Sequence, residues 1–220
     1  MTMLSEAEKE QRRLKALSLY EIMDSANEKV FDDLTRLAAN ICNTPISLIS
    51  LVDDKRQWFK SRVGLDATET PREYAFCAHA ILQDELMEVE DAKLDERFKN
   101  NPLVTEEPKI RFYAGMPLST SEGEKLGTLC VIDQKPHKLD ENQVASLKIL
   151  SEAVQGHLEL RRARIELGEL KKLVPLCAWC KNIRVEEGST EDWIPLHKYL
   201  EDNVPVSHSI CPDCKDKFVD

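Results

Sequence analysis

Residues 111–133, RFYAGMPLSTSEGEKLGTLCVID, decide the fold of this chain. Apolar residues recur at every second position from Phe112 to Leu118 and again from Leu126 to Ile132. The polar connection between them contains Gly123, and glycine is the residue type that most easily adopts a positive φ. Such a pattern predicts a β-hairpin. Because both faces of its second strand are apolar or small, we expect a central strand, covered by helices on one side and by core or an enclosed pocket on the other.

The segments around this hairpin alternate between helical and extended patterns. Helices are predicted over 5–22, 25–42 and 141–173, and strands over 46–52, 57–63 and 86–89. The pairs Ser5/Glu8 and Ser25/Glu28 have the spacing of capping boxes. A short helix or ordered loop is expected over 72–82, with loops over 64–71 and 91–109. Strands joined by short turns, with helices at both ends, indicate an α+β domain with an antiparallel sheet.

The composition excludes several classes of protein. The chain has 220 residues, 42% of them hydrophobic, and a formal net charge of −10. This charge argues against binding to nucleic acid or to an anionic membrane, because both need a basic surface. The sequence contains no apolar run of membrane-spanning or signal-peptide length. Its seven cysteines are an odd number. We therefore expect a cytoplasmic protein without a disulfide framework.

Four runs of sequence resemble the GAF domain of bacterial two-component and cyclic-di-nucleotide signalling proteins. They are PISLISLVDDKRQWFKSRVGLDATETPREYAFCAHAIL (45–82), NPLV (101–104), IRFYAGMPL (110–118) and GTLCVID (127–133). The resemblance implies a six-stranded antiparallel sheet with helices on one face and a small-molecule pocket, closed by loops, over the other. It also implies that the first and last helices lie together and often form a dimer interface. GAF domains variously bind cyclic nucleotides, haem, bilins, amino acids or metals.

Candidate ligand-binding residues come from the aromatic, cysteine and histidine positions of this region. They are Trp58, Cys77, His79, Phe112, Tyr113 and Cys130. Aromatic residues on a sheet and single cysteines are also common in cores, so packing is the alternative for each. Cys77 is a candidate redox-sensing thiol, a ligand-attachment site or, with His79, part of a metal or haem site. If Cys77 and Cys130 both face the pocket, they form a candidate redox pair.

The C-terminal segment carries a separate metal-binding pattern. Cys177 and Cys180 form one CxxC pair, and Cys211 and Cys214 form a second. Four thiolates at this spacing predict a closed, structural Zn²⁺ site. His208 is an alternative ligand, and a redox or disulfide role is the remaining alternative. Between the pairs we expect a turn at 186–192 and a helix at 194–201. A module with so few large apolar residues is expected to depend on the metal for folding.

These patterns predict four parts of the chain. They are an N-terminal helix (1–22), a GAF domain (23–160), a helical linker (161–174) and a zinc-binding module (175–220). The charged start of the first helix and the thin apolar seam of the last suggest helix pairing in a homodimer. No nucleophile elbow, phosphate-binding loop or dinucleotide motif is present.

We therefore predict a non-enzymatic sensory or regulatory signalling protein. Its GAF domain would sense a small molecule or redox state, and its zinc module would contact a protein partner. One alternative is a thiol-dependent enzyme of the free methionine sulfoxide reductase type that uses Cys77 and Cys130. The other is a ligand-free dimerisation scaffold.

Overall fold

The computed structural model describes residues 5–171, 176–177, 179–184 and 193–203. The chain divides into two compact units, Met1–Ile165 and Glu166–Asp220. The first unit contains the sheet and the helices packed on it, and the second contains the CxxC segment.

The first unit is built on a six-stranded sheet in which every pair of neighbours is antiparallel. Its strands are β1 (Ile46–Val52), β2 (Arg56–Val63), β3 (Glu69–Pro71), β4 (Met87–Val89), β5 (Phe112–Ser119) and β6 (Lys125–Asp133). The order across the sheet is β3-β2-β1-β6-β5-β4. The hairpin β5–β6 is confirmed, and β6 is central because it pairs with both β5 and β1. Gly123, in its turn, has φ +85° as expected.

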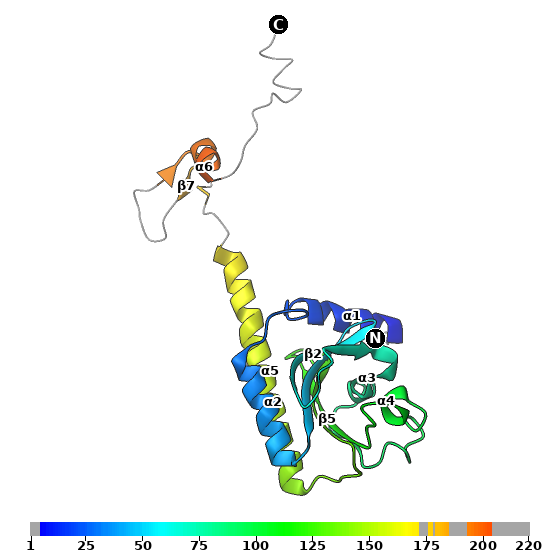
Figure 1. Ribbon diagram of the computed structural model, residues 1–220. Helices are drawn as coiled ribbons and strands as arrows, with labels where there is room; N and C mark the ends of the chain where they lie inside the picture. Colours follow the sequence, from blue (N-terminus) through cyan, green and yellow to red (C-terminus); the bar gives the residue numbers. More distant parts are fainter. Residues whose placement is uncertain (1–4, 172–175, 178, 185–192, 204–220) are drawn as a thin grey trace. The chain divides into compact units, whose positions relative to one another are not determined.

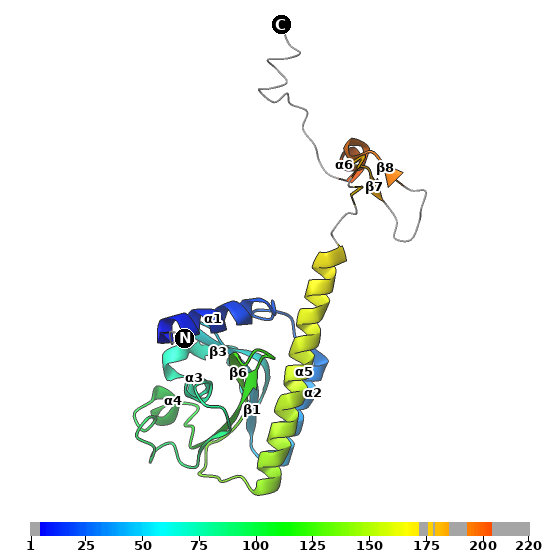
Figure 2. The same cartoon turned by 180° about the vertical axis from the view of Figure 1, so that it is seen from behind.

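Helices cover both faces of this sheet. The long helices α2 (Lys29–Cys42) and α5 (Glu141–Lys171) lie side by side against one face (Figures 1 and 2). The other face is covered by the short helices α3 (Phe76–Ala80) and α4 (Pro102–Thr105), with a 3-10 turn at Arg72–Tyr74. The prediction of helices on one face alone is therefore wrong. The second face is closed by short helical segments as well as by loops.

Two apolar cores follow from the alternation of side chains along the strands. The core under α2 and α5 takes Ile49, Leu51, Leu129 and Val131 from the central strands β1 and β6. The core under α3 takes the alternate positions of the same strands, among them Leu48, Val52, Cys130 and Ile132. A strand that is apolar on both faces is thus buried on both faces, as the sequence of β1 and β6 requires.

The first helix, α1 (Glu6–Ser18), belongs to the first of these cores. Leu17 is 3% exposed and Tyr20 is fully buried. The Arg13 guanidinium donates a hydrogen bond to the carbonyl of Val52 at 2.6 Å. This helix therefore has a place in the core, and its pairing with a second subunit stays a prediction. Its apolar residues are few, but they are used within the same unit.

The two predicted capping boxes have different outcomes. Ser5 and Glu8 form a capping box at the start of α1. Ser25 and Glu28 form no capping box, because α2 begins only at Lys29; Glu28 is its N-cap residue and makes no capping hydrogen bond through its side chain. Their side chains instead surround the buried ammonium of Lys60, which lies 2.8 Å from Ser25 Oγ and 2.8 Å from the Glu28 carboxylate. A buried cation needs these partners, and this need overrides the local capping preference.

Two short elements of the first unit were not predicted from the sequence. They are β3 and α4, which have three and four residues. A segment of this length cannot show a full hydrophobic period, so tertiary pairing specifies it. For β3 that pairing is with β2, where Gln57 lies directly opposite Thr70.

The described part of the second unit is a small hairpin followed by a helix. Strands β7 (Ile183–Arg184) and β8 (Trp193–Ile194) pair antiparallel, and α6 (Leu196–Asn203) follows. The predicted helix at 194–201 thus begins two residues later. The predicted turn at 186–192, His208, Cys211 and Cys214 lie outside the described residues.

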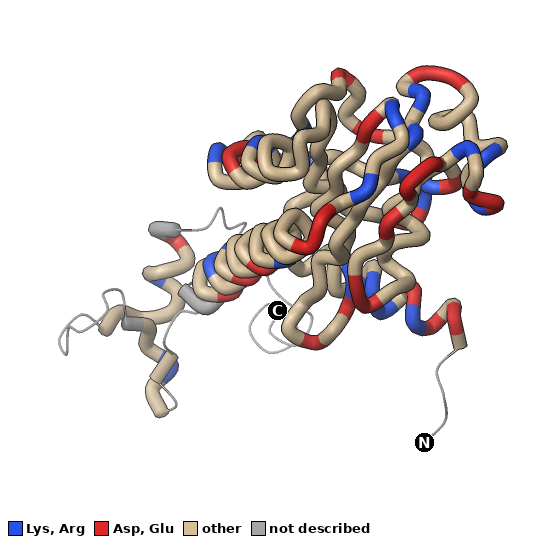
Figure 3. Tube along the Cα trace, turned by 90° about the horizontal axis from the view of Figure 1, so that it is seen from below, with Lys and Arg blue, Asp and Glu red and all other residues tan. Residues whose placement is uncertain are grey.

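Charged residues of both signs are interspersed along the described chain (Figure 3). Many form ion pairs with one another, such as Arg111 with Asp91 at 2.6 Å. Of the helices in the described segments, none has the length and hydropathy needed to cross a membrane.

A tight contact between the central strands gives a test of this fold. A Cβ added at Gly127 would lie 1.9 Å from the carbonyl oxygen of Ser50 on β1, so Gly127→Ala must push the two strands apart. We expect a loss of about 1–3 kcal/mol in the free energy of unfolding, measured by urea titration. Gly156→Ala on α5 is the matched control, because its Cβ meets no atom within 4 Å. For this variant we expect the free energy of unfolding to increase by up to about 1 kcal/mol, because alanine favours a helix over glycine. An equal response of the two variants would contradict the strand register.

Candidate functional site

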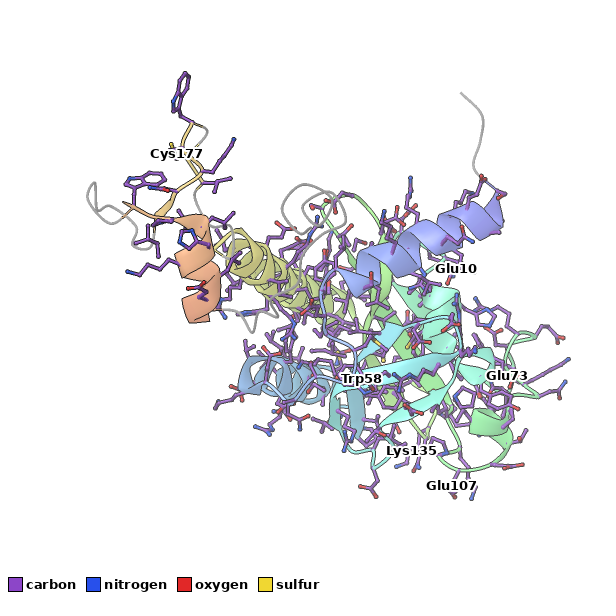
Figure 4. All side chains as sticks on the ribbon, turned by 90° about the horizontal axis from the view of Figure 1, so that it is seen from above. Glu10, Trp58, Glu73, Glu107, Lys135 and Cys177 are labelled. Carbon is purple, nitrogen blue, oxygen red and sulfur yellow. The ribbon has the colours of Figure 1, made fainter. Side chains whose placement is uncertain are left out.

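A cavity of about 390 Å³ lies on the face of the sheet that carries α3 and α4. Its walls are mostly apolar, and its aromatic members are Phe59, Phe76 and Tyr113. The connection between β2 and β3 contributes Gly64–Ala67, and the segment after α4 contributes Glu107 and Pro108. Glu107 lies at the edge of the unit, whereas Trp58 lies inside it (Figure 4). A cavity of this size and character is typical of small-molecule sites.

The thiol of Cys77, on α3, lines this cavity and is 1% exposed. It lies within hydrogen-bond distance of three groups from the sheet. The Thr128 hydroxyl is 3.0 Å from the Cys77 sulfur, the Tyr113 hydroxyl is 3.2 Å away and the Cys130 sulfur is 3.9 Å away. Ser50 on β1 continues the network, with its hydroxyl 3.1 Å from that of Thr128.

These donors change the acidity of the buried thiol. Burial by itself raises the pKa of Cys77, because a buried thiolate loses its hydration. Hydrogen bonds outweigh this cost and lower the pKa to about 7; the donors are Cys130, Ser50, Thr128 and Tyr113. The hydrogen bond to Cys77, with burial, raises the pKa of Cys130. Burial and the Cys77 charge raise the pKa of Tyr113. Cys77 is thus the group of this cluster that ionises first.

A glycine makes room for this arrangement. A Cβ at Gly115 would lie 2.1 Å from the hydroxyl oxygen of Tyr113, two residues earlier on the same face of β5. Only a residue without a side chain lets the Tyr113 ring lie along the strand and reach Cys77. Gly115 is therefore required by the site.

The structure separates the six predicted ligand-binding residues into three groups. Cys77 and Tyr113 line the cavity, and Cys130 lies beside them beneath Cys77. His79 is on the same side of the sheet but packs edge-on against Phe98, with ring centroids 4.9 Å apart, and does not line the cavity. Its pKa is lowered by burial and by the charge of Arg97.

Trp58 and Phe112 form the third group. Both are buried in the core under α2 and α5, on the opposite face of the sheet. Alternation along β2 places Gln57 and Phe59, rather than Trp58, at the cavity. The structure therefore gives Trp58 and Phe112 a packing role, the alternative that the sequence left open.

Sequence reasoning missed the polar residues of the site. Thr128 lies two positions before Cys130 on β6 and so shares its face, and Ser50 is its direct partner on β1. This period-2 relation is visible in the sequence, but it becomes informative only when the pairing of β1 with β6 is known. Thr70 was missed because β3 was not predicted, and Gln57 because the sequence of β2 does not show which of its faces meets the cavity.

Half of the predicted zinc site can be inspected. Cys177 and Cys180 lie in a turn in which the backbone N–H of Cys180 reaches the Cys177 sulfur at 3.5 Å. This contact and a backbone hydrogen bond from Trp179 lower the pKa of Cys177, favouring the thiolate. Among the described residues no group of three or more His, Cys, Asp or Glu is placed to hold a metal. The predicted site remains a prediction, because its other ligands lie outside the described residues.

Comparison with known proteins identifies the family. A model described as the GAF domain matches residues 27–158, more than half of the chain. The chain therefore belongs to the GAF domain family, as its sequence motifs indicated. The first unit, Met1–Ile165, contains all of the matched residues.

Solved structures support the same fold. The GAF domain of a phosphoenolpyruvate-protein phosphotransferase from Coxiella burnetii has a TM-score of 0.51 at 19% identity, with 73% of this chain and 98% of that chain covered. Free methionine-R-sulfoxide reductase from Neisseria meningitidis has a TM-score of 0.51 at 16% identity, with 74% and 98% covered. At these identities the likeness shows the fold alone.

A relative from Pseudomonas aeruginosa is closer in sequence. The protein named cyclic di-GMP phosphodiesterase PA2567 is 46% identical over 143 residues, which are 64% of this chain and 24% of the relative. The chain thus spans about a quarter of the relative's length. This finding contradicts the prediction of a non-enzymatic protein, since the relative is named as an enzyme. The sequence showed no catalytic motif, and the prediction took that absence as an argument.

The donor cluster predicts how the acidity of Cys77 responds to mutation. Thr128→Val removes one donor, so the pKa of Cys77 should rise by about one unit or more, as expected for a lost hydrogen bond to a charged group. Thiolate absorbance against pH measures this, with Cys77→Ser as the blank. Ser47→Ala is the control, because Ser47 is a buried strand hydroxyl that bonds instead to the Cys130 carbonyl. It should leave the pKa at about 7.

The lowered pKa of Cys77 in the folded protein predicts that stability depends on pH. The folded pKa of Cys77, about 7, lies below the reference value of 9.0, so the unfolded chain binds more protons between these values. Stability should therefore rise from pH 7 to pH 9 and this contribution should be lost as the pH falls through 7. Thr128→Val should flatten this rise. A wild-type thiol that titrates near its ordinary value would contradict the donor cluster.

Proposed function

We propose that this protein acts in cyclic di-GMP signalling and that its GAF domain is the sensory part. In this proposal a small molecule in the cavity, or oxidation of Cys77, controls cyclic di-GMP turnover. The observation that carries it is the cavity itself, which has apolar walls and an acidic thiol at its base. The 46% identity to a protein named cyclic di-GMP phosphodiesterase supports the signalling context. A cavity of about 390 Å³ favours a ligand site over a ligand-free scaffold.

The position of β6 suggests how the cavity is coupled to the rest of the unit. Cys130 faces Cys77, while the neighbouring Leu129 and Val131 face the core under α5. That core includes Leu147 and Val154 of α5. Close-packed side chains transmit displacements, so a change at Cys77 that moves β6 also changes the packing of α5.

Redox sensing is a second candidate, favoured by the 3.9 Å between the sulfurs of Cys77 and Cys130. A peroxide would oxidise the Cys77 thiolate to a sulfenic acid and leave as an alcohol or water. The Cys130 thiol would then attack that sulfur, releasing water and forming a disulfide. The same two thiols would serve the alternative activity, in which a sulfoxide is reduced to a sulfide with formation of the disulfide and water.

A cellular experiment tests the two candidates together. In a strain without the gene, the wild-type gene should restore the cyclic di-GMP pool, measured by mass spectrometry. Leu103→Trp, which fills the cavity, should fail to restore it, whereas Leu82→Trp, at a side chain 75% exposed and outside the cavity lining, should succeed. A peroxide-dependent change that is lost in Cys77→Ser but kept in Cys42→Ala would favour redox sensing. A cyclic di-GMP pool that is the same with all of these variants would refute the proposal.

We also propose that the second unit binds one structural Zn²⁺ through Cys177, Cys180, Cys211 and Cys214 and contacts a protein partner. Apolar side chains are exposed in its described part; Trp179 is 94% exposed and Leu176 is 49% exposed. Exposed aromatic side chains are typical of protein interfaces. A homodimer through α5 is proposed as well, since Ile149 and Leu160 are 65% and 46% exposed on that helix.

Native mass spectrometry of freshly purified protein tests these assignments in one measurement. We expect a dimer with one zinc per chain, and the loss of most bound zinc in Cys177→Ser because a closed site needs all four ligands. Cys42→Ser is the control, since Cys42 is buried in the core of the first unit. A reduced protein with no zinc would contradict the metal site, and a monomer at micromolar concentration would contradict the dimer.

A further inference from the structure

Two buried oxygen atoms at the cavity lack hydrogen-bond partners. They are Oε1 of Gln57 and Oγ1 of Thr70, and neither has a partner among the described residues. Gln57 is only 5% exposed, and both residues line the cavity. A buried polar atom without a partner is costly, so such atoms mark places where a ligand or water supplies the missing bond.

The two oxygens come from one position of the sheet. Gln57 on β2 lies directly opposite Thr70 on β3 in the strand register. Directly opposed residues of an antiparallel pair have Cβ atoms about 4.5–5.5 Å apart on the same face. A single donor group bound between these two side chains would supply the bond that each oxygen lacks. This polar pair is the specific feature of an otherwise apolar cavity.

The charged residues around the cavity indicate which charge the donor group of the ligand carries. Among the described residues that line it, the charged ones are Asp66 and Glu107, which are acidic and exposed; Glu107 pairs with Lys109 at 2.8 Å. Cys77, which is the first group of its cluster to ionise, adds a further negative charge when deprotonated. No Lys or Arg occurs in the described lining, so a phosphate or carboxylate ligand would be buried without a counter-ion. An ammonium group meets acceptors and negative charge together.

The walls define the remainder of the ligand. Phe59, Phe76 and Tyr113 contribute aromatic surface, and Leu48 and Ile132 contribute aliphatic surface. Aromatic faces also attract cations. A hydrocarbon body placed against these walls gains the free energy of apolar burial, while its polar end is held at the edge formed by β2 and β3.

We propose that the cavity binds a small amine with an apolar body, and that its ammonium group donates hydrogen bonds to Gln57 and Thr70. This inference rests on the proposed ligand-sensing role of the same cavity and specifies the class of ligand. It excludes cyclic di-GMP as the occupant, because that molecule carries two phosphate anions and the described lining of the cavity offers no Lys or Arg to pair with them. Cyclic di-GMP then belongs to the output of the protein, and the amine to its input.

Three probes of similar shape test the ligand class. They are 2-phenylethylamine, 2-phenylethanol and phenylacetate, which present a cation, a neutral hydroxyl and an anion. Their binding to the full chain is measured by calorimetry at neutral pH. We expect the amine to bind at least about tenfold more tightly than the alcohol, the difference of one charge-assisted hydrogen bond, and the acid to bind least. Leu103→Trp should abolish binding of the amine.

Variants of the polar pair provide a second, independent readout. Thr70→Val and Gln57→Leu should each weaken amine binding about tenfold and should raise the melting temperature of the free protein, because an unpartnered buried oxygen is removed. Thr68→Val is the matched control, at an exposed position outside the lining, and should change neither quantity. A variant that keeps full amine affinity would overturn the assignment of the polar pair.

The outcomes separate this inference from the proposed function. If the acid or the alcohol binds best and Leu103→Trp abolishes that binding, the amine class is wrong and the cavity remains a ligand site. If none of the three probes binds, the inference fails; if the cavity-filling variant also restores cyclic di-GMP levels in cells, the proposed function fails with it.

Discussion

The hydrogen-bonded burial of the Cys77 thiol is the interaction on which the site depends. Its partners Tyr113 and Thr128 come from the hairpin β5–β6, and Ser50 extends the network to β1. Buried polar groups must satisfy one another, so this cluster holds α3 against the middle of the sheet. With α3 fixed there, space remains between the sheet, α4 and the β2–β3 connection. The cavity occupies that space.

The central strands give the domain two cores with different uses. One face of β1 and β6 packs under the long helices α2 and α5. The apolar surface buried there stabilises the folded domain. The other face packs under short helices and is interrupted by polar groups and the cavity. The sheet thus separates a structural side from a binding side, and the strands β1 and β6 contribute alternate residues to both. A sensory domain needs both properties.

Most of the fold was predictable because its long elements show clear periods. The alternation in β5 and β6 and the apolar stripe of α2 predicted the correct elements, and the GAF motifs predicted the sheet. The exceptions have physical causes. Lys60 is buried and recruits Ser25 and Glu28, so the expected cap of α2 does not form. The three-residue strand β3 carries no period of its own, and its absence from the prediction hid Thr70.

The site was less predictable than the fold because it depends on which face a residue occupies. The sequence named Cys77, Tyr113 and Cys130 as candidates without showing that they meet, and it named Trp58 and Phe112 equally, although these two lie on the opposite face. A strand that is apolar on both faces gives no signal of which face binds a ligand. The register between strands decides it, and register is a tertiary property. The expectation of a non-enzymatic protein failed for another reason, since it rested on motifs that the sequence lacks.

The central claim is that the space beside Cys77 is a ligand site. A high-resolution crystal structure of the freshly purified protein tests it most directly. The account predicts density for a small molecule in the cavity, with an atom within hydrogen-bond distance of Gln57 and Thr70. A structure in which Phe59 and Phe76 close onto Cys77 and leave no cavity would contradict it.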